Sequence, residues 1–411
     1  MAVTTRLLLA IILFSAFLLS AANAIREYQG QQDQGGTRLL DVSPSDQIES
    51  EGGFTELWDE NEEQFQCAGV APLRLVIHCN SLSLPKFHPM PRLTFQSQTF
   101  QAGQEPREER GHGRGGDQHQ KVHPGAAHWC YNDGEEELVA VAVYDLNHRS
   151  NQLDQNFRTF YLAGGVQESE SQRAQTGLRK QSTQKFQNIF RAFDTELFAE
   201  AFDIPTEIVK KMQEEQTERQ QWWEEIIGNG LEENICTMKI RTNIETQRRA
   251  DIFSRQAGKV NHVGRQKLSI LEYIDMSASE GTIYPNALMS PLWTLTGHSV
   301  VYVERGDAQV QAVDHTGQQV MNDKVNQGEM FVAPQYFPAM IKAGENGFEF
   351  VVFRTSSQPM NNQLAGYTSV IRAMPVEVLT NAYQISPNEA QRLKINRGGE
   401  SLLLSPQRRS S

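Results

Sequence analysis

The stretch most indicative of chemistry lies near the middle of the chain and reads GNGLEENIC over residues 228–236. It places an Asn-Gly pair, Asn229 and Gly230, just before two glutamates and Cys236. An isolated Asn-Gly pair predicts a tight turn, because both residues tolerate positive φ angles. Whether Asn229 has a further role depends on the segments on either side of it.

The four cysteines of the chain are the other residues whose side chains could react or bind a metal. They are Cys67, Cys79, Cys130 and Cys236. They show no CxxC spacing and no nearby pair of histidines, which argues against a zinc site. Disulfides are the better interpretation if the chain enters an oxidising compartment.

The N-terminus indicates that it does. Arg6 is followed by an apolar run over residues 7–19 and by the small residues Ala22-Asn23-Ala24, as in a cleaved secretory signal. A membrane anchor is the alternative, but the run is short for a spanning helix and no later segment is apolar enough. We therefore expect residues 1–24 to be removed and the mature protein to have no membrane contact.

The net charge of the chain changes sign at the Asn-Gly pair. Residues 25–229 carry 19 Lys and Arg against 33 Asp and Glu, whereas residues 230–411 carry 18 against 17. The first part has a net charge of −14 and the second of +1. Neither part has a basic patch dense enough to bind nucleic acid.

Most of the chain reads as short β-strands. Residues 25–47 are Gln- and Gly-rich and are expected to be disordered, and residues 101–121 form a charged loop. Expected strands lie within residues 48–83, with Phe54, Leu57, Trp58 and the apolar run 70–77, and at 137–145, 268–276, 299–306, 308–314, 329–334 and 348–354. Helical periodicity appears at 185–227 and 374–394. The strand spacing predicts an antiparallel barrel or jelly roll.

An internal repeat relates the two helical regions. Residues 193–212 align without gaps on residues 374–393, 181 positions later. Upstream, the tripeptide NQL occurs at 151–153 and again at 362–364. Each half is therefore predicted to end in a strand, an NQL turn and a helical tail, which leaves Asn229 in an exposed linker between the copies.

Five segments of the sequence resemble the legumin-type (11S) seed storage globulins. They are 48–70, 127–134, 229–244, 250–263 and 286–311, and NGLEENIC at the boundary of two repeats is the most specific. The resemblance implies a mainly β fold of two tandem cupin (jelly-roll) barrels, each followed by a helical arm, assembled as trimers and then hexamers. The expected parts are a signal peptide (1–24), a disordered segment (25–47), a first barrel (48–177), an arm and linker (178–228), a processing junction (229–244), a second barrel (245–372), an arm (373–397) and a tail (398–411).

The resemblance also implies what happens at the junction and in the arms. An asparaginyl endopeptidase of the seed protein storage vacuole is expected to cut after Asn229, releasing an acidic and a basic chain. Arm residues Phe190, Phe193, Leu379 and Tyr383 are expected to be exposed and to pack between protomers. The implied function is that of a nutrient reservoir, with no catalytic activity and no cofactor.

Departures from the family pattern concern the first barrel and the disulfides. Strand segments that the family has after Leu93 and after Pro124 are absent, so we expect a shortened first barrel that is open on one side. Cys67 and Cys236 match family cysteines, but the usual partner of each is missing. Cys79 and Cys130 are left as free thiols or as substitute partners.

A cupin that binds a metal or a small ligand is the alternative function. Metal-dependent cupins need three histidines and a glutamate inside a barrel. In the second barrel the matching positions are Leu292, Thr294, Ser299 and Ala339. His262 and His298 are better interpreted as surface or packing residues. The first barrel retains His88 and His128 near ligand positions, a weak metal site without a carboxylate.

Overall fold

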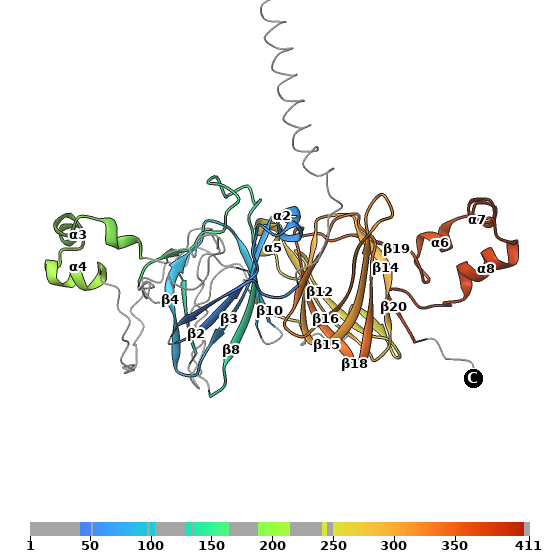
Figure 1. Ribbon diagram of the computed structural model, residues 1–411, viewed down its shortest axis with the longest axis horizontal. Coiled ribbons are helices and arrows are strands. Elements are labelled where there is room, and N and C mark those ends of the chain that lie inside the picture. The colour runs from blue at the N-terminus through green and yellow to red at the C-terminus, as the bar shows by residue number, and fades with distance from the viewer. Residues whose placement is uncertain are drawn as a thin grey trace, which may run out of the picture.

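The computed structural model describes residues 42–50, 52–96, 99–102, 128–132, 135–163, 188–213, 241–244 and 250–406. Two β-rich halves lie side by side, and a group of helices extends from the outer end of each (Figure 1). The fold class expected from the sequence, mainly β with two tandem barrels of jelly-roll type and a helical arm after each, is confirmed. No helix of the described residues is long and apolar enough to cross a membrane.

The N-terminal half (residues 42–213) contains most of the first barrel and its arm. Its elements are β1 (Asp46–Ser50), β2 (Gly53–Leu57), α2 (Glu63–Ala68), β3 (Val70–Ile77), β4 (Ser81–Phe87), β5 (Arg92–Gln96), β6 (Thr99–Ala102), β7 (His128–Asn132), β8 (Leu138–Asp145), β9 (Phe160–Tyr161), the 3-10 helix η2 (Ile189–Ala192), α3 (Thr195–Phe202) and α4 (Thr206–Gln213). A further strand, β10 (Arg241–Asn243), completes its larger sheet.

The C-terminal half (residues 250–406) repeats this order. Its elements are β11 (Ile252–Ser254), β12 (Gly258–Val263), α5 (Ile270–Ile274), β13 (Ser277–Ile283), β14 (Leu288–Thr294), β15 (Ser299–Val313), β16 (Gln319–Asn326), β17 (Met330–Ala333), β18 (Ala339–Arg354), β19 (Asn361–Gln363), α6 (Val370–Ala373), α7 (Val376–Tyr383), α8 (Pro387–Ile395) and β20 (Leu403–Leu404). Strands β15 and β18 are long enough to pair with several neighbours each.

Strand pairing differs between the halves. The first half has a sheet of order β1-β2-β3-β8-β5-β6-β10 and a second sheet of order β7-β4-β9, whereas the strands of the second half belong to one sheet. All the paired strands are antiparallel, as expected for a jelly roll. Residues 103–127, which separate β6 from β7, lie outside the described residues, so the open side of the first barrel stays a prediction.

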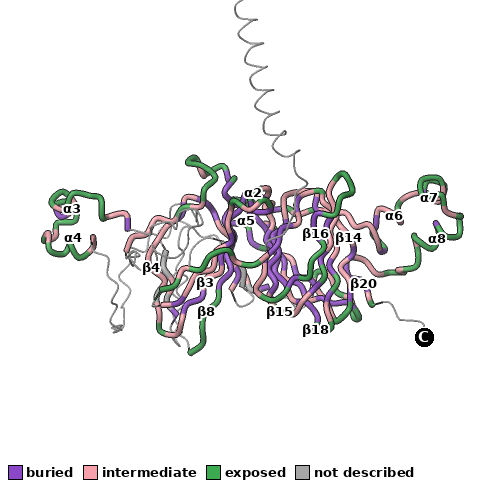
Figure 2. The backbone as a smooth tube through the Cα atoms, in the orientation of Figure 1, coloured by how far each residue is buried: buried purple, intermediate pink, exposed green. Residues whose placement is uncertain are grey.

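One hydrophobic core joins the halves. It combines Trp58, Phe65 and Leu93 of the first half with Leu271 and Phe353 of the second, all of them buried. Figure 2 shows this buried zone in purple where the halves meet. Full burial of such a side chain is worth about 1.5–3 kcal/mol, so separating the halves would expose a large part of the stabilising surface.

Three local expectations were wrong. Residues 268–276 were expected to be a strand, but the structure has helix α5 there, followed by β13. Leu268, Leu271 and Ile274 are buried at a helical spacing, and Asp275 ends the helix with φ 49°.

The second error concerns the segment 25–47, which was expected to be disordered. Its residues Asp46 and Gln47 lie in β1. Val42 accepts hydrogen bonds from the Trp58 indole at 3.0 Å and from the Met330 amide at 2.8 Å.

The third error concerns the NQL tripeptides. Asn361–Gln363 forms β19, whose Gln363 pairs with Leu292 of β14. The equivalent strand of the first half is β9, whose Tyr161 pairs with Lys86 of β4. The first NQL, residues 151–153, lies in a loop before β9. The two tripeptides are therefore not structural equivalents.

The helical arms do follow the predicted repeat. Asp203 ends α3 and Gln384 ends α7, both with a left-handed backbone (φ 52° and 55°), at matching positions of the repeat. Val209 and Ala390, also equivalent, are both buried. Phe193 and Tyr383 are 57% and 54% exposed, but Leu379, expected to be exposed, is fully buried within its own arm.

Candidate functional site

Strand β10 places the segment that follows the Asn-Gly pair on the first barrel. Asn229, Gly230 and Cys236 lie outside the described residues. Arg241–Asn243 nevertheless pairs antiparallel with β6, and Ile244 is fully buried in the shared core. The chain after the junction thus first adds a strand to the first barrel and then enters the second.

The described cysteines lie apart from one another in the first half. Cys67 is on α2, where burial and then the charge of Glu63 raise the pKa of its thiol. Cys130 of β7 pairs with Ser83, which is four residues from Cys79 along the chain. Cys79 itself lies in the turn before β4, and the structure has no disulfide among the described cysteines, so their pairing stays a prediction.

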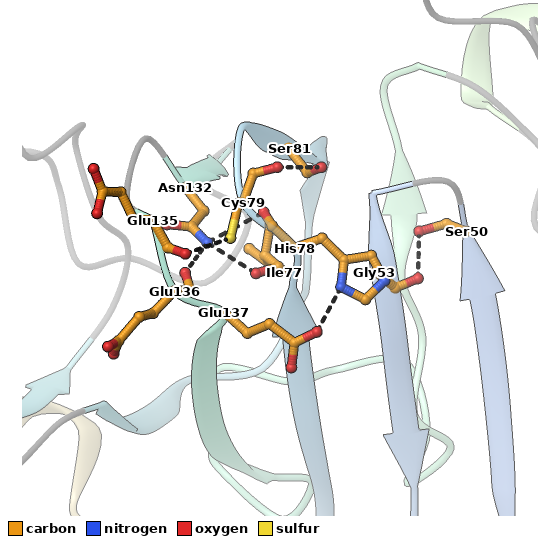
Figure 3. A network of polar contacts seen from close by, with 10 residues as sticks. All are labelled: Ser50, Gly53, Ile77, His78, Cys79, Ser81, Asn132, Glu135, Glu136 and Glu137. Atoms are coloured by element: carbon orange, nitrogen blue, oxygen red, sulfur yellow. Dashed lines mark hydrogen bonds and ion pairs between the residues drawn. The ribbon is translucent and has the colours of Figure 1, made fainter.

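Cys79 belongs to a polar network at the turn between β3 and β4 (Figure 3). Its thiol donates to the Glu135 carbonyl at 3.0 Å. The buried amide of Asn132 donates to the Ile77, His78 and Glu136 carbonyls at 3.0, 3.1 and 2.8 Å. His78 pairs with Glu137 at 2.9 Å beside the ring of Phe54. These contacts stabilise the turn, and they give Cys79 a structural role in it.

His88 and His128, the weak metal candidates, come from neighbouring parts of the smaller sheet. His88 follows β4, and the backbone of His128 pairs with Lys86 of the same strand. His88 is buried between the rings of Tyr144 and Phe157, at 4.6 and 5.5 Å, and its Nε2 lies 3.1 Å from the Thr159 hydroxyl. These contacts orient His88 as a packed side chain.

The corresponding positions of the second barrel converge as expected but lack metal donors. Leu292 pairs with Ala339 across β14 and β18, and the hydroxyls of Thr294 and Ser299 lie 3.3 Å apart. Leucine and alanine have no ligand atoms, and a neutral hydroxyl pair is a poor metal site. Throughout the described ranges, no three His, Cys, Asp or Glu side chains are grouped so as to hold a metal ion.

His262 and His298 are packing residues in the structure. His262 Nδ1 lies 3.0 Å from the Ser279 hydroxyl, and burial, Arg354 and Lys267 lower its pKa to about 4. Burial also lowers the pKa of His298, whose Nδ1 accepts from the Gln335 amide at 3.3 Å. Both shifts favour the neutral ring, which suits these half-buried positions.

A cleft of about 380 Å³ lies between the two halves. It is lined by Asp145, Asn147, His148, Arg149, Arg265, Glu272, Tyr273, Asp275 and Ser357. Burial raises the pKa of Asp145 to about 6, against hydrogen bonds from the Asn147 and His148 amides, and the charge of Asp275 adds to the increase. Arg265 and Glu272 form an ion pair of 3.0 Å at the same place. The cleft therefore places a carboxyl with a raised pKa between the halves.

Sequence reasoning missed two cations in the first barrel. Lys86 and Arg92 occupy the register positions that Leu292 and Ser299 hold in the second barrel, since Lys86 pairs with His128 and Arg92 with Tyr144. The only signal was the presence of Lys, His and Arg in LPKFHPMPRL, residues 84–93. Their convergence depends on strand pairing, which the spacing alone does not give.

Two tandem antiparallel barrels of the jelly-roll type, joined by one core and each followed by a helical arm, define a bicupin. The cupin family model matches residues 242–391. The chain is 52% identical to 11S globulin seed storage protein 2 of Sesamum indicum, with 93% of this chain and 94% of that protein covered. That alignment spans 437 positions, more than the 411 residues of this chain, so the sesame protein has segments that this chain lacks.

Solved structures give the same result. The pumpkin seed globulin is 35% identical, with a TM-score of 0.76 and coverage of 90% of this chain and 99% of that one. The coconut globulin cocosin has the same TM-score and coverage at 33% identity. This chain belongs to the 11S globulin family of seed storage proteins.

Proposed function

We propose that the chain is the precursor of a seed nitrogen and amino-acid reservoir, cut after Asn229 into an acidic and a basic chain. The observation that carries this function is the 52% identity to a seed storage globulin over almost the whole length. The composition supports it, because 39 Gln and 21 Asn add side-chain nitrogen to the backbone nitrogen of the chain. We assign the processed protein to the protein storage vacuole, which it reaches through the secretory pathway.

Cleavage after Asn229 is compatible with an intact fold. The pairing of β10 with β6 and the burial of Ile244 would hold the new basic chain against the first barrel after the cut. The shared core would retain the second barrel in the same way. An asparaginyl endopeptidase fits the asparagine and the small residue that follows it, and an exposed linker is the type of segment that proteases cut.

The arms support assembly into trimers and hexamers. Several apolar arm residues are about half exposed or more: Phe193, Leu197, Phe202, Ile208, Val378, Tyr383, Leu393 and Ile395. The helices that carry them, α3 and α4 in one arm and α7 and α8 in the other, lie at opposite ends of the molecule (Figure 1). Because large apolar surfaces on an isolated protomer are characteristic of contact sites, we assign these faces to contacts between protomers.

Processing is tested by expressing variants in developing seeds and sequencing the N-terminus of the basic chain. The proposal predicts Gly230 as its first residue, and a single uncut chain for Asn229→Ala. Asn234→Ala, which changes an asparagine of the same stretch, is the matched control and should be cut normally. A basic chain that begins elsewhere, or normal cutting of the Asn229→Ala variant, contradicts the proposed site.

A further inference from the structure

A second Asn-Gly pair lies on a strand of the second barrel. It is Asn346-Gly347, which belongs to β18. In such a pair the backbone nitrogen of the glycine can attack the side-chain amide carbon of the asparagine, because glycine has no side chain to hinder the approach. In a folded protein the reaction requires an asparagine side chain that is accessible and is not held by other groups.

The pair lies in a bulge of β18. Phe348 pairs with Gly306 of β15, and Ala343 pairs with Ala308 of the same strand. Residues 344–347 therefore lie opposite a single residue of β15, which makes them the extra length of an irregular bulge. Ala343 and Phe348 are both buried in the core of the second barrel, so the two ends of the bulge are anchored.

The side chain of Asn346 is exposed on this bulge. It forms no hydrogen bond with any group in the part of the chain that the structure describes. Other asparagines are held: the Asn132 amide donates to three backbone carbonyls, and the Asn322 side-chain oxygen accepts from Gln309 and Gln311 at 2.9 and 3.0 Å. The amide of Asn346 can therefore turn toward the next backbone nitrogen without breaking a hydrogen bond.

The fold requires a glycine directly after Asn346. Gly347 has φ 83°, a left-handed conformation that residues with a side chain rarely adopt. A Cβ added to Gly306 would lie 2.1 Å from the Gly347 carbonyl oxygen, and one added to Gly347 itself would lie 3.2 Å from the Ile283 carbonyl oxygen. The geometry of the bulge therefore keeps an unhindered nitrogen beside the Asn346 side chain.

We propose that Asn346 is a site of spontaneous deamidation. The Gly347 nitrogen bonds to Cγ of Asn346 and the Cγ–Nδ2 bond breaks, so that the amide nitrogen leaves as ammonia with the proton given up by Gly347. Water then opens the five-membered imide. Breakage of the bond between Cγ and the Gly347 nitrogen gives aspartate, and breakage of the original peptide bond gives isoaspartate. Water is the only reagent, and the site is independent of the storage function and of cleavage after Asn229.

The experiment is incubation of the intact recombinant precursor at pH 7 and at pH 8, followed by tryptic digestion and mass spectrometry against an unincubated sample. Asn346 is the only amide side chain in the tryptic peptide 343–354, so a change from amide to acid there is assigned without ambiguity. We expect this peptide to convert while the peptide 306–324, which contains Asn322, stays unchanged. The rate should rise by up to about tenfold per pH unit, because one proton must leave the attacking nitrogen.

Two variants and a synthetic peptide complete the test. Asn346→Asp supplies the aspartate product as a chromatographic standard, and the converted protein should contain a second, isoaspartate form beside it. Asn346→Gln, whose longer side chain would need a larger ring, should show no conversion. If a synthetic peptide of residues 343–354 converts but the folded protein does not, the proposal is overturned. Conversion to aspartate alone, or equal conversion of Asn322, also overturns it.

Discussion

The side-chain oxygen of Gln64 on α2 accepts a hydrogen bond from the backbone amide of Val332 on β17, 268 residues later, at 3.1 Å. The contact is buried and crosses from the first half of the chain to the second. Strand β17 pairs on its other side with β15, so a side chain of the first barrel satisfies an edge donor of the second. The relationship shows how the two barrels form one folded body.

Gln64→Leu tests the energetic importance of this contact. The substitution leaves the Val332 amide buried without an acceptor, which should reduce the free energy of unfolding by about 1–3 kcal/mol. Gln66→Leu changes an exposed glutamine of the same helix and should have little effect. Urea unfolding of both variants gives the comparison, and equal stabilities would show that the Gln64 contact contributes nothing.

Two glycines occupy the same place in the two barrels, and each should be irreplaceable. Gly53 and Gly258 begin β2 and β12 with φ 134°, and an added Cβ would lie 2.0 Å from the Val76 carbonyl and 1.9 Å from that of Thr282. Backbone strain and the clash should make Gly258→Ala destabilising by about 3 kcal/mol or more. Gly399→Ala, which meets nothing within 4 Å, is the control. Similar melting temperatures for the two variants would refute the argument.

Asp145 should make stability depend on pH between about 4 and 6. Its folded pKa is raised from 3.8 to about 6, so its contribution to stability is fully present below pH 3.8 and is lost as the pH rises through 6. The loss amounts to roughly 3 kcal/mol, at 1.36 kcal/mol per pKa unit. Asp145→Asn should remove it, so that the variant is more stable than the unchanged protein at pH 7 but not at pH 3.5.

Melting curves of the two proteins at pH 3.5 and pH 7 check this expectation. Asp323→Asn, which removes an exposed carboxylate of β16, controls for the change in net charge. If Asp145→Asn shifts the melting temperature equally at both pH values, Asp145 does not titrate in this range.

The exposed apolar face of the first arm should be required for assembly but not for folding. Leu197 of α3 is 67% exposed in the single chain, so Leu197→Glu should leave the fold of the protomer unchanged. A charge buried between protomers is strongly unfavourable, so the same variant should sediment as a smaller species. Lys210→Ala on α4 is the control and should assemble normally. Assembly of Leu197→Glu at the unchanged size would mean that this face is not a contact.

The elements that the sequence predicted well include the long runs rich in Val and other apolar residues. The run 70–77 and the segment 137–145 are buried strands because they pair with each other along their full length, from Val70 with Asp145 to Ile77 with Leu138. Residues 268–276 misled because a short apolar run suits either a strand or a buried helix. There the spacing of Leu268, Leu271 and Ile274 was the better guide.

The candidate site was less predictable for a physical reason. The convergence of Leu292 with Ala339, or of Lys86 with His128, is set by hydrogen-bond register between strands 42 to 47 residues apart. The residues at the cupin ligand positions could be read from the sequence, but their cross-strand neighbours could not. Burial of Leu379 was missed because the repeat predicted its helix and not how α7 and α8 pack together.

The storage function is tested most directly by measuring the amount of this protein in seeds through germination. Mass spectrometry of protein storage vacuoles should find its acidic and basic peptides among the most abundant in dry seed. Their amount should fall as the seedling grows, while free amino acids increase. A protein that is scarce in mature seed, or that persists unchanged in the established seedling, would contradict a role as a nitrogen reservoir.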